Sequence, residues 1–449
     1  MSKRLVILGA GESGVGAAIL GKQQQFDVFV SDRGRIATKY KDLLLEENIA
    51  FEEGCHSEEK ILTADLVVKS PGIPDRTPLV EKLRNQDVSV ISEIEFGSWF
   101  TQAKLIGITG SNGKTTTTSL VYHILKSAGY SVGIAGNIGD SFALQVAKSD
   151  YEYYVLELSS FQLDGIVDLK LDISILLNIT PDHLDRYNNN LSEYIDAKFQ
   201  LIRNVDQHSV FFYNSDDHNI VTKLHKTERP HLSYAFSING ALENGIGLES
   251  NEIIIDINKA MRISVDRIPL KGKHNAYNIM ASVSVASVLG VDKHDIMVAL
   301  ASFQPIEHRM EQVVVLNGVE YINDSKATNV DSVFYALESI TNKIIWIAGG
   351  VDKGNDYSQL LPLVKSKVHG MVCLGKDNSK LHEVFGDIVH QITDARSAYE
   401  AVQKSSAMAE EGFTVLLSPA CASFDLFENY EDRGKKFKHE IYKLNAKFK

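Results

Sequence analysis

The sequence has few cysteines and no long apolar run. It contains 3 cysteines in 449 residues, and Cys55, Cys373 and Cys421 form neither a CxxC pair nor a metal-ligand spacing. This usage is typical of proteins from a reducing compartment. No apolar run approaches the ~18 residues of a membrane-spanning helix. The apolar run at residues 5–8 is too short for the core of a signal peptide, so we expect a cytoplasmic protein.

An excess of positive charge is also missing. The chain has 58 acidic and 46 basic residues and a formal net charge of −12. Nucleic acid is therefore not an expected partner, since it is itself a polyanion, and any phosphate must bind in a local pocket. Low-complexity segments are absent as well. At about 150 residues per domain, the length suggests roughly three domains.

A glycine-rich turn follows the first predicted strand. Residues 9–14 have the spacing G-x-G-x-x-G, and Asp32 follows at the end of the next predicted strand. This pattern is typical of dinucleotide-binding folds, where the acidic residue holds a ribose. The alternatives are a fold for another nucleotide or a purely structural turn. A third predicted strand, at residues 65–68, leads into a loop with Pro71 and Gly72, at a strand end where open α/β sheets bind ligands.

The clearest motif is the stretch 109–117, Thr-Gly-Ser-Asn-Gly-Lys-Thr-Thr-Thr. It lies between a predicted strand (105–108) and a predicted helix, which is the context of a phosphate-binding loop. Lys114 can reach the β- and γ-phosphates, and the Thr115 hydroxyl can bind Mg²⁺. The strict motif requires glycine where Ile108 stands, so the match is to the Gly-Lys-Thr end only.

Ionisable residues follow the next two predicted strands. Glu157 interrupts an apolar strand, and a buried carboxylate is costly unless it is paired or bound to metal. Glu157 is therefore a predicted Mg²⁺ ligand, with a structural salt bridge as the alternative. Polar residues crowd positions 178–187, where His183 is either a metal ligand or structural. By spacing alone, Lys198 is a solvated surface lysine.

The remainder of the chain predicts further β structure and a second parallel sheet. Asn275 and Asn278 lie near the start of a predicted helix, and their spacing favours capping over reading a base edge. Asn317-Gly318 predicts a hairpin. Predicted strands and helices then alternate, which indicates a Rossmann-like sheet. The strands are predicted at 344–348, 371–374 and 414–417.

Together these motifs resemble those of the Mur ligase family, the ATP-dependent amino-acid ligases of peptidoglycan precursor synthesis. The loop 109–115 is similar to the phosphate loop of this family, including the departure at Ile108. The stretches 156–163 (Leu-Glu-Leu-Ser-Ser-Phe-Gln-Leu) and 323–329 (Asn-Asp-Ser-Lys-Ala-Thr-Asn) are similar to those of members that add D-glutamate. The resemblance extends from Gly9 to Arg433.

The resemblance implies an α/β protein of three domains. Residues 1–95 would be a Rossmann-like domain for the UDP substrate. Residues 96–300 would be a central P-loop NTPase-like domain, with a mostly parallel sheet and extra β strands, for ATP. Residues 301–449 would be a Rossmann-like domain for the amino acid. The implied reaction adds D-glutamate to UDP-N-acetylmuramoyl-L-alanine through an acyl phosphate.

The resemblance also implies roles for individual residues. ATP would bind Gly110, Ser111, Asn112, Gly113, Lys114, Thr115, Thr116, Asn275, Asn278, Arg309 and Asp324. The UDP substrate would bind Ser13, Asp32, Arg33, Gly72, Asn137, Ser159, Gln162 and His183. D-glutamate would bind Thr328, Lys353, Ser423 and Tyr430. The implied catalytic set is Lys114, Glu157, His183 and Lys198.

Two Mg²⁺ ions are implied, one on Thr115 and Glu157 and one on His183 and Lys198. Lys198 would be carbamylated by CO₂, which reverses its interpretation as a surface lysine. The implied partners are small molecules, and we expect a monomer. The alternatives are another Mur-type or folylpolyglutamate-type amide ligase, or an NAD-dependent oxidoreductase.

Overall fold

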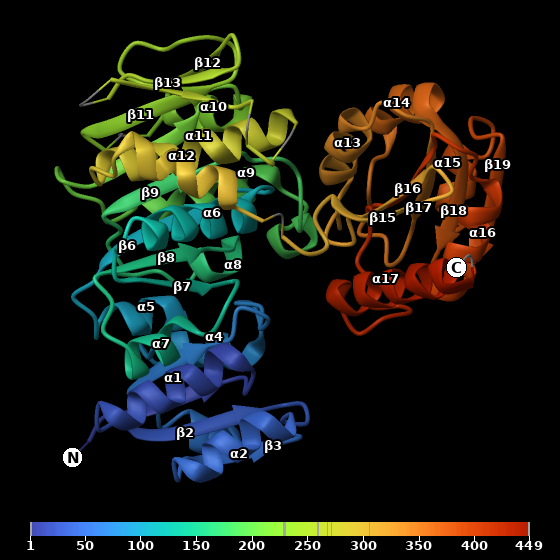
Figure 1. Cartoon of the computed structure of the whole chain (residues 1–449). Coiled ribbons are helices and arrows are strands. Elements are labelled where there is room, and N and C mark those ends of the chain that lie inside the picture. The colour runs from blue at the N-terminus through green and yellow to red at the C-terminus, as the bar shows by residue number, and fades with distance from the viewer. Residues whose placement is uncertain are drawn as a thin grey trace. The chain divides into compact units, whose positions relative to one another are not determined.

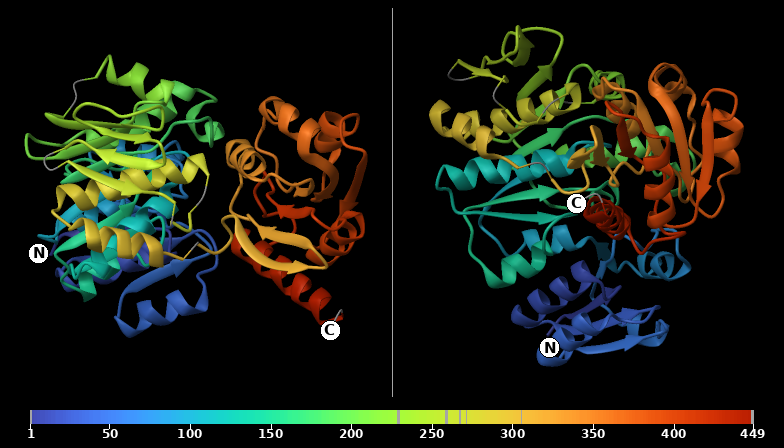
Figure 2. Two further views of the ribbon diagram at one scale, coloured as in Figure 1. Left: turned by 45° about the horizontal axis from the view of Figure 1, so that its top comes forward. Right: turned by 45° about the vertical axis from the view of Figure 1, so that its right-hand side comes forward.

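The computed structural model describes residues 2–227, 230–257, 260–266, 268–270, 272–304 and 306–447. They form two compact units. The first unit comprises the chain up to residue 268 together with 277–302, and the second comprises 269–276 together with the chain from 303 onwards. Three sheets with their helices make up these units (Figures 1 and 2). Each sheet lies within one of the three predicted domain ranges.

The first sheet has the strand order β3-β2-β1-β4-β5, and all its pairings are parallel. Its strands are β1 (Arg4–Leu8), β2 (Asp27–Asp32), β3 (Ala50–Glu53), β4 (Leu66–Lys69) and β5 (Ser89–Ile91). Its helices are α1 (Glu12–Gln23), α2 (Thr38–Glu46), α3 (Glu58–Ile61), α4 (Pro78–Asn85) and α5 (Glu93–Ser98). The predicted strands are β1, β2 and β4. The short edge strands β3 and β5 escaped prediction because neither has a long apolar run.

The second sheet has nine strands in the order β14-β13-β12-β11-β10-β9-β6-β8-β7. Its parallel part contains β6 (Lys104–Thr109), β7 (Val132–Gly136), β8 (Tyr153–Glu157), β9 (Ile173–Leu176), β10 (Val210–Asn214), β11 (Leu232–Ser237) and β12 (Ile246–Glu249). Strands β13 (Glu252–Ile255) and β14 (Met261–Ser264) extend it in antiparallel fashion. Strand β6 lies between β8 and β9, so the loop after β6 is surrounded by strand ends.

Helices of the first unit flank this sheet, and the first turn of one of them, α11, is counted with the second unit (Figure 1). They are α6 (Lys114–Ser127), α7 (Phe142–Lys148), α8 (Ser160–Leu163), α9 (Leu191–Phe199), α10 (His218–Leu224), α11 (Lys273–Val288) and α12 (Lys293–Ser302), with the 3-10 helices Leu184–Tyr187 and Gln200–Ile202. Helix α7 packs against α1 and α5, which joins the first two sheets into one unit.

The third sheet has the order β15-β16-β20-β17-β18-β19 and belongs to the second unit. Its strands are β15 (Glu311–Leu316), β16 (Val319–Asn323), β17 (Ile344–Ala348), β18 (Val368–Leu374), β19 (Gln391–Ala395) and β20 (Thr414–Leu417). The helices are α13 (Val330–Ser339), α14 (Leu361–Lys367), α15 (Ser379–Phe385), α16 (Ala398–Met408) and α17 (Tyr430–Lys447), with the 3-10 helix Ser358–Leu360.

The predicted hairpin is confirmed, since β15 and β16 pair in antiparallel fashion. Asn317 and Gly318 both have positive φ, 50° and 75°, as a two-residue hairpin turn requires.

The three sheets are mostly parallel and are covered by helices, so the predicted α/β fold class is confirmed. Within the described ranges, the structure contains no helix long and apolar enough to cross a membrane.

Candidate active site

The phosphate loop joins β6 to α6. Gly113 has φ +85°, and a Cβ there would meet Asn278 Oδ1 at 2.4 Å, so glycine is required on both grounds. Asn178 follows β9 and holds the loop from the side. Its Oδ1 accepts a hydrogen bond from the Asn112 backbone N–H at 2.8 Å, and its Nδ2 donates to the Asn112 carbonyl oxygen at 3.0 Å. The loop is thus shaped by its neighbours.

Two lysines meet at this loop. Lys114 Nζ donates to the carbonyl oxygens of Gly110 at 2.8 Å and Ser111 at 2.9 Å. Lys198 Nζ donates to the same Gly110 oxygen at 2.8 Å. Lys198 is only 1% exposed, so its interpretation as a surface lysine from spacing is wrong. Burial, followed by the charge of Lys114, holds the pKa of Lys198 well below its usual range.

Tyr194 connects Lys198 to the loop. Lys198 Nζ lies 4.6 Å from the centre of the Tyr194 ring, and the Tyr194 hydroxyl lies 3.1 Å from Ser111 Oγ. Ser111 Oγ in turn donates to the Thr180 carbonyl oxygen at 2.8 Å. Tyr194 precedes Lys198 by one helical turn on α9, so the spacing alone could have flagged it.

Glu157 lies at the end of β8 and is 1% exposed. Asn137 Nδ2 donates to its Oε1 at 2.8 Å. Its Oε2 is buried and has no hydrogen-bond partner among the described residues. An unsatisfied buried carboxylate oxygen is costly, and a bound cation removes that cost. With the Thr115 hydroxyl in the first turn of α6, this oxygen gives the hard donor set that Mg²⁺ prefers, so these residues fit the predicted ion.

His183 lies in the polar segment after β9. Its φ of 52° is left-handed, and its side chain is 39% exposed. Its Nε2 lies 3.6 Å from Asp182 Oδ2, and its ring packs edge-on against Phe161 at 5.2 Å. His183 is therefore a partly solvated imidazole beside a carboxylate. This environment is compatible both with a metal ligand and with a structural histidine.

The predicted UDP residues of the first sheet surround the glycine-rich turn. Asp32 Oδ2 accepts a hydrogen bond from the Ala10 N–H at 2.7 Å, and its Oδ1 accepts one from the Gly34 N–H at 2.7 Å. Asp32 therefore shapes the turn through the backbone. Ser13 lies in the first turn of α1 and is half-buried, and Arg33 is exposed. Their contacts with a nucleotide remain predictions.

Gly72 and the middle domain are linked by Arg186. The Arg186 guanidinium donates to the carbonyl oxygens of Pro71 at 3.3 Å and Gly72 at 3.5 Å, and lies 4.4 Å from the Phe161 ring centre. A cavity of about 290 Å³ lies beside this link, lined in part by Arg76, Phe161 and Asp164. The structure thus places the loop after β4 beside the His183 segment.

Ser159 and Gln162 form a capping box at the start of α8. Ser159 Oγ accepts a hydrogen bond from the Gln162 N–H at 3.3 Å, and Gln162 Oε1 accepts one from the Ser159 N–H at 3.0 Å. Both side chains therefore stabilise the turn that follows Glu157. Their predicted contact with substrate remains a prediction.

Asn278 is buried inside α11, where its Oδ1 accepts a hydrogen bond from Thr117 Oγ1 at 3.1 Å. Asn275 also lies within this helix, which begins at Lys273. The capping interpretation of Asn278 is therefore wrong, because the helix starts earlier than the spacing suggests, whereas capping by Asn275 in the first turn stays a prediction. Asn278 instead braces the phosphate-loop helix. Asn275 belongs to the second unit.

Asp324, predicted to bind ATP, is buried at the end of β16 in the second unit. Its Oδ2 accepts a hydrogen bond from Ser418 Oγ at 2.8 Å, and its Oδ1 accepts one from the Met310 N–H at 3.2 Å. Burial raises the pKa of Asp324 to about 7. Arg309 carries a buried Nε without a hydrogen-bond partner among the described residues, a donor suited to an anionic ligand.

Three of the predicted D-glutamate residues lie on loops at the carboxyl ends of strands in the third sheet, and the fourth, Tyr430, is the first residue of α17. Thr328 follows β16 and is half-buried, Lys353 follows β17 and is exposed, and Ser423 follows β20 and is buried. The Tyr430 carbonyl oxygen accepts a hydrogen bond from Ser325 Oγ at 2.8 Å. Ligands of open α/β sheets bind at such strand ends.

Arg433, missed at the sequence level, ties these loops together. It is 1% exposed and donates from Nη2 to the Ser325 carbonyl oxygen at 2.8 Å and from Nη1 to the Cys421 carbonyl oxygen at 3.2 Å. No local signal marks it, since it stands in an ordinary charged helix, α17.

Comparison with known proteins decides the family. Residues 4–79 match the model of the MurD N-terminal domain, residues 108–286 the Mur ligase middle domain, and residues 308–421 the Mur ligase glutamate ligase domain. A UDP-N-acetylmuramoylalanine–D-glutamate ligase from Christiangramia forsetii is 51% identical over 99% of this chain and 100% of its own length. The chain belongs to the Mur ligase family. It is therefore an ATP-dependent amide ligase. Mg²⁺ is a typical cofactor in this family.

Other relatives agree with this assignment. A ligase of the same name from Bacteroides fragilis is 51% identical over 98% of this chain and 100% of its own length. Among solved structures, a UDP-N-acetylmuramate-alanine ligase from Thermotoga maritima has a TM-score of 0.63 at 19% identity and covers 98% of this chain and 99% of its own. This structure supports the Mur ligase fold. Family membership also removes the oxidoreductase alternative for the glycine-rich turn.

Proposed function

We propose that this Mur ligase joins the amine of D-glutamate to the alanyl carboxylate of UDP-N-acetylmuramoyl-L-alanine, a step of peptidoglycan precursor synthesis. The observation that carries the proposal is the full-length match, at 51% identity, to ligases named for this reaction. The phosphate loop, the Glu157 carboxylate and the buried Lys198 supply groups suited to the chemistry.

The first step activates the carboxylate, which is a poor electrophile. A carboxylate oxygen of the substrate attacks the γ-phosphorus of ATP, and the bond from this phosphorus to the β-phosphate oxygen breaks. The products are ADP and the acyl phosphate of the substrate. Negative charge gathers on the transferring group during this step. Lys114 lies on the phosphate loop, where its ammonium stabilises that charge.

In the second step the amine of D-glutamate attacks the acyl carbon, and inorganic phosphate leaves from the tetrahedral intermediate. One proton of the amine must be taken up. We assign this role to His183, whose imidazole is partly solvated and lies beside Asp182, at a stage when His183 is not bound to metal, because a metal-bound imidazole has no free lone pair to accept a proton. The substrate contacts inferred for Ser13, Asp32, Arg33, Gly72, Asn137, Ser159 and Gln162, and for Thr328, Lys353, Ser423 and Tyr430, form part of this proposal.

Metal binding completes the proposed site. Thr115 and the unpartnered Oε2 of Glu157 would hold one Mg²⁺, and His183 with a carbamylated Lys198 would hold a second. Bound Mg²⁺ neutralises charge on the phosphates. Carbamylation requires a neutral amine, and the depressed pKa of Lys198 supports it.

Phosphate release from ATP tests the proposal. Purified full-length protein is given UDP-N-acetylmuramoyl-L-alanine, ATP and Mg²⁺ with D-glutamate, L-glutamate, L-lysine or D-alanine as acceptor. We expect release that depends on both the nucleotide sugar and D-glutamate. Release with a different acceptor would move the protein to a sister step of the family, such as another Mur-type or a folylpolyglutamate-type reaction.

A matched pair of lysines on helix α6 controls this assay. Lys114→Ala should abolish phosphate release, since the ammonium on the phosphate loop is lost. Lys126→Ala, in the last turn of the same helix, should retain it, because Lys126 Nζ bonds only to the Tyr122 hydroxyl among the contacts described. Equal loss in both variants would contradict a specific role for Lys114.

We further propose a cytoplasmic monomer. The low cysteine content, without a CxxC pair, supports the compartment. Light scattering of the purified protein should give the mass of a single chain, and a dimer mass would refute the proposed monomer.

A further inference from the structure

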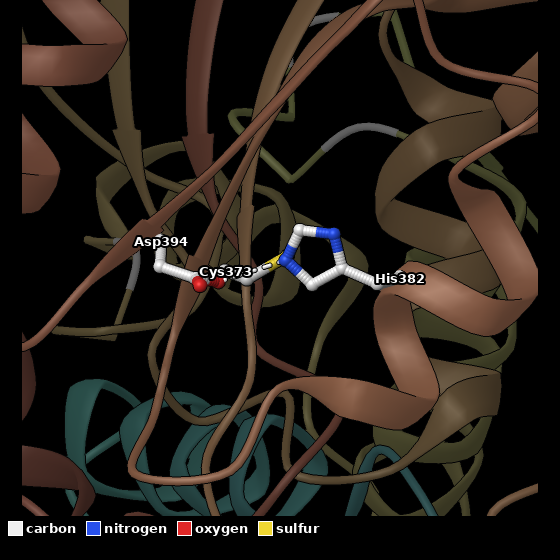
Figure 3. Close-up of side chains that lie close together, drawn as sticks. All are labelled: Cys373, His382 and Asp394. Carbon is white, nitrogen blue, oxygen red and sulfur yellow. Dashed lines mark hydrogen bonds and ion pairs between the residues drawn. The ribbon is translucent and has the colours of Figure 1, made fainter.

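Three potential metal ligands of different chemistry meet at one edge of the third sheet. They are the Cys373 thiol, the His382 imidazole and the Asp394 carboxylate, and their ligand atoms all lie within 4.8 Å of one another (Figure 3). None of them belongs to the proposed ligase site. Their positions in the sequence have no recognisable metal-site spacing, so only the fold reveals the cluster.

The fold explains why they converge. Cys373 on β18 and Asp394 on β19 are directly paired residues of neighbouring parallel strands, so their side chains point to the same face. His382 lies on α15, which covers that face. The neighbouring Leu381 and Phe385 of α15 pack into the same buried cluster as Cys373 and thereby hold the helix in place.

The spacing of the three ligand atoms is close to that of a metal site. His382 Nε2 lies 2.9 Å from Asp394 Oδ1. With metal–ligand bonds of 2.0–2.3 Å, tetrahedral ligand atoms are separated by about 3.4 Å. Cys373 is fully buried, whereas the side chains of His382 and Asp394 are 39% and 52% exposed. The two exposed side chains can therefore rotate around a fixed sulfur.

A further side chain orients the carboxylate. Asn378 is buried, and its Nδ2 donates to Asp394 Oδ1 at 2.9 Å and to the Cys373 carbonyl oxygen at 3.0 Å. Hydrogen bonds of this kind to ligating groups restrict their orientation and are a regular feature of protein metal sites. Asn378 therefore links the strand that carries the thiol to the carboxylate opposite it.

We propose that Cys373, His382 and Asp394 bind a borderline-soft divalent metal ion, Zn²⁺ above all, with water as the fourth ligand. Thiolate and imidazole favour Zn²⁺ over Mg²⁺, which prefers oxygen ligands. On binding, the thiol proton is released to solvent as the sulfur–metal bond forms. The imidazole binds through the Nε2 lone pair and keeps its proton on Nδ1. No electron transfer is involved.

The site would fasten α15 to the edge strand β19. Without metal, the same residues form a surface His–Asp hydrogen bond above a buried thiol, and that is the competing explanation. The two explanations differ in the sulfur: a metal site requires the Cys373 thiolate as a ligand, whereas the hydrogen bond does not. The proposal does not depend on the ligase reaction.

Co²⁺, used as a spectroscopic probe, distinguishes the metal site from the surface His–Asp hydrogen bond. Metal-free, full-length protein under reducing conditions is titrated with CoCl₂. We expect one equivalent to produce a sulfur-to-cobalt charge-transfer band in the near ultraviolet together with intense visible bands of a tetrahedral ion, both abolished by Zn²⁺ and unaffected by excess Mg²⁺. A cobalt ion at the oxygen ligands of Glu157 and Thr115 gives no such sulfur band.

Variants assign the band to the cluster. Cys373→Ser should remove it, and His382→Gln should weaken Co²⁺ binding at least about 10-fold, because one of three protein ligands is lost. Cys421→Ser, a second buried cysteine in the same unit, is the matched control and should retain the band. If Cys373→Ser does not fold, the wild-type spectrum and the variant His382→Gln, at a partly exposed position, still test the proposed metal site. Absence of a sulfur band in the wild type, or its persistence in Cys373→Ser, overturns the proposal.

Discussion

Lys114 and Lys198 donate to one and the same acceptor, the carbonyl oxygen of Gly110, each at 2.8 Å. Two ammonium groups on one oxygen repel each other, and Lys198 is also buried. Its pKa is lowered by burial first and by Lys114 second. A lowered pKa increases the share of Lys198 present as the neutral amine, which is the form that reacts with CO₂.

The first prediction is that Lys198 takes up CO₂. The amine nitrogen bonds to the carbon of CO₂ and releases a proton, so uptake requires the neutral amine and, given the lowered pKa, should persist to lower pH than at surface lysines. Protein equilibrated with ¹³C-bicarbonate should show one carbamate signal by ¹³C NMR. Lys198→Arg should abolish it, whereas Lys223→Arg, at a half-buried lysine of α10 that pairs with Asp196, should not. A signal that survives Lys198→Arg would refute the assignment.

The second prediction concerns the unpartnered oxygen of Glu157. In Glu157→Gln the amide oxygen can still accept the hydrogen bond of Asn137, so the fold should be retained. The loss of an anionic oxygen should weaken metal binding and lower turnover by about 10²-fold or more. Phosphate release measured against Mg²⁺ concentration gives both quantities, and circular dichroism checks the fold. An unchanged Mg²⁺ dependence would exclude Glu157 as a ligand.

The third prediction is a pH-dependent stability from Glu93. This carboxyl is buried between α5 and α7, where its Oε1 accepts hydrogen bonds from Ser141 Oγ and the Ala143 N–H, both at 2.6 Å. Burial raises the pKa of Glu93 from 4.5 to about 7, and the charge of Glu12 acts in the same direction. The folded protein therefore binds more protons than the unfolded chain between these values.

It follows that the contribution of Glu93 to the free energy of unfolding is full below pH 4.5 and decreases as the pH rises to about 7, by up to about 3 kcal/mol. Glu93→Gln cannot ionise and should flatten this dependence. Thermal unfolding of both proteins between pH 5 and pH 8 measures the difference. Parallel curves for wild type and variant would mean that Glu93 does not titrate in this range.

The fourth prediction uses two glycines of one turn. A Cβ at Gly14 would meet the Gly9 carbonyl oxygen at 1.9 Å, whereas a Cβ at Gly11 meets nothing within 4 Å. Gly14→Ala should therefore destabilise the first unit by about 1–3 kcal/mol through overpacking. Gly11→Ala should cost about 1 kcal/mol or less, because its φ of −79° suits any residue.

The affinity for the UDP substrate shows whether this turn binds the diphosphate or is purely structural. If the turn holds the diphosphate of the UDP substrate, Gly11→Ala should raise the KM for that substrate while the unfolding transition hardly moves. An unchanged KM in Gly11→Ala would argue against the diphosphate at this position.

Local backbone chemistry was sufficient to predict the phosphate loop. A strand, a turn with Gly110 and Gly113, and a helix starting at Lys114 are consecutive in the chain, so their geometry follows from neighbouring residues. The same holds for the glycine-rich turn and for the hairpin at Asn317-Gly318. The Mur ligase motifs belong to this class too, because each is a contiguous stretch.

The tertiary structure decided which polar side chains are buried and which distant residues lie close together. Lys198 occurs in a polar stretch typical of a surface helix, yet α9 packs it against Gly110, a residue far away in the sequence. Asn278 lies inside α11 and braces Thr117, although its spacing favours a cap. Cys373, His382 and Asp394 share no motif and meet only because paired parallel strands and the covering helix bring them together. Sequence pattern reports on neighbours along the chain, whereas these contacts arise from the packing of distant elements.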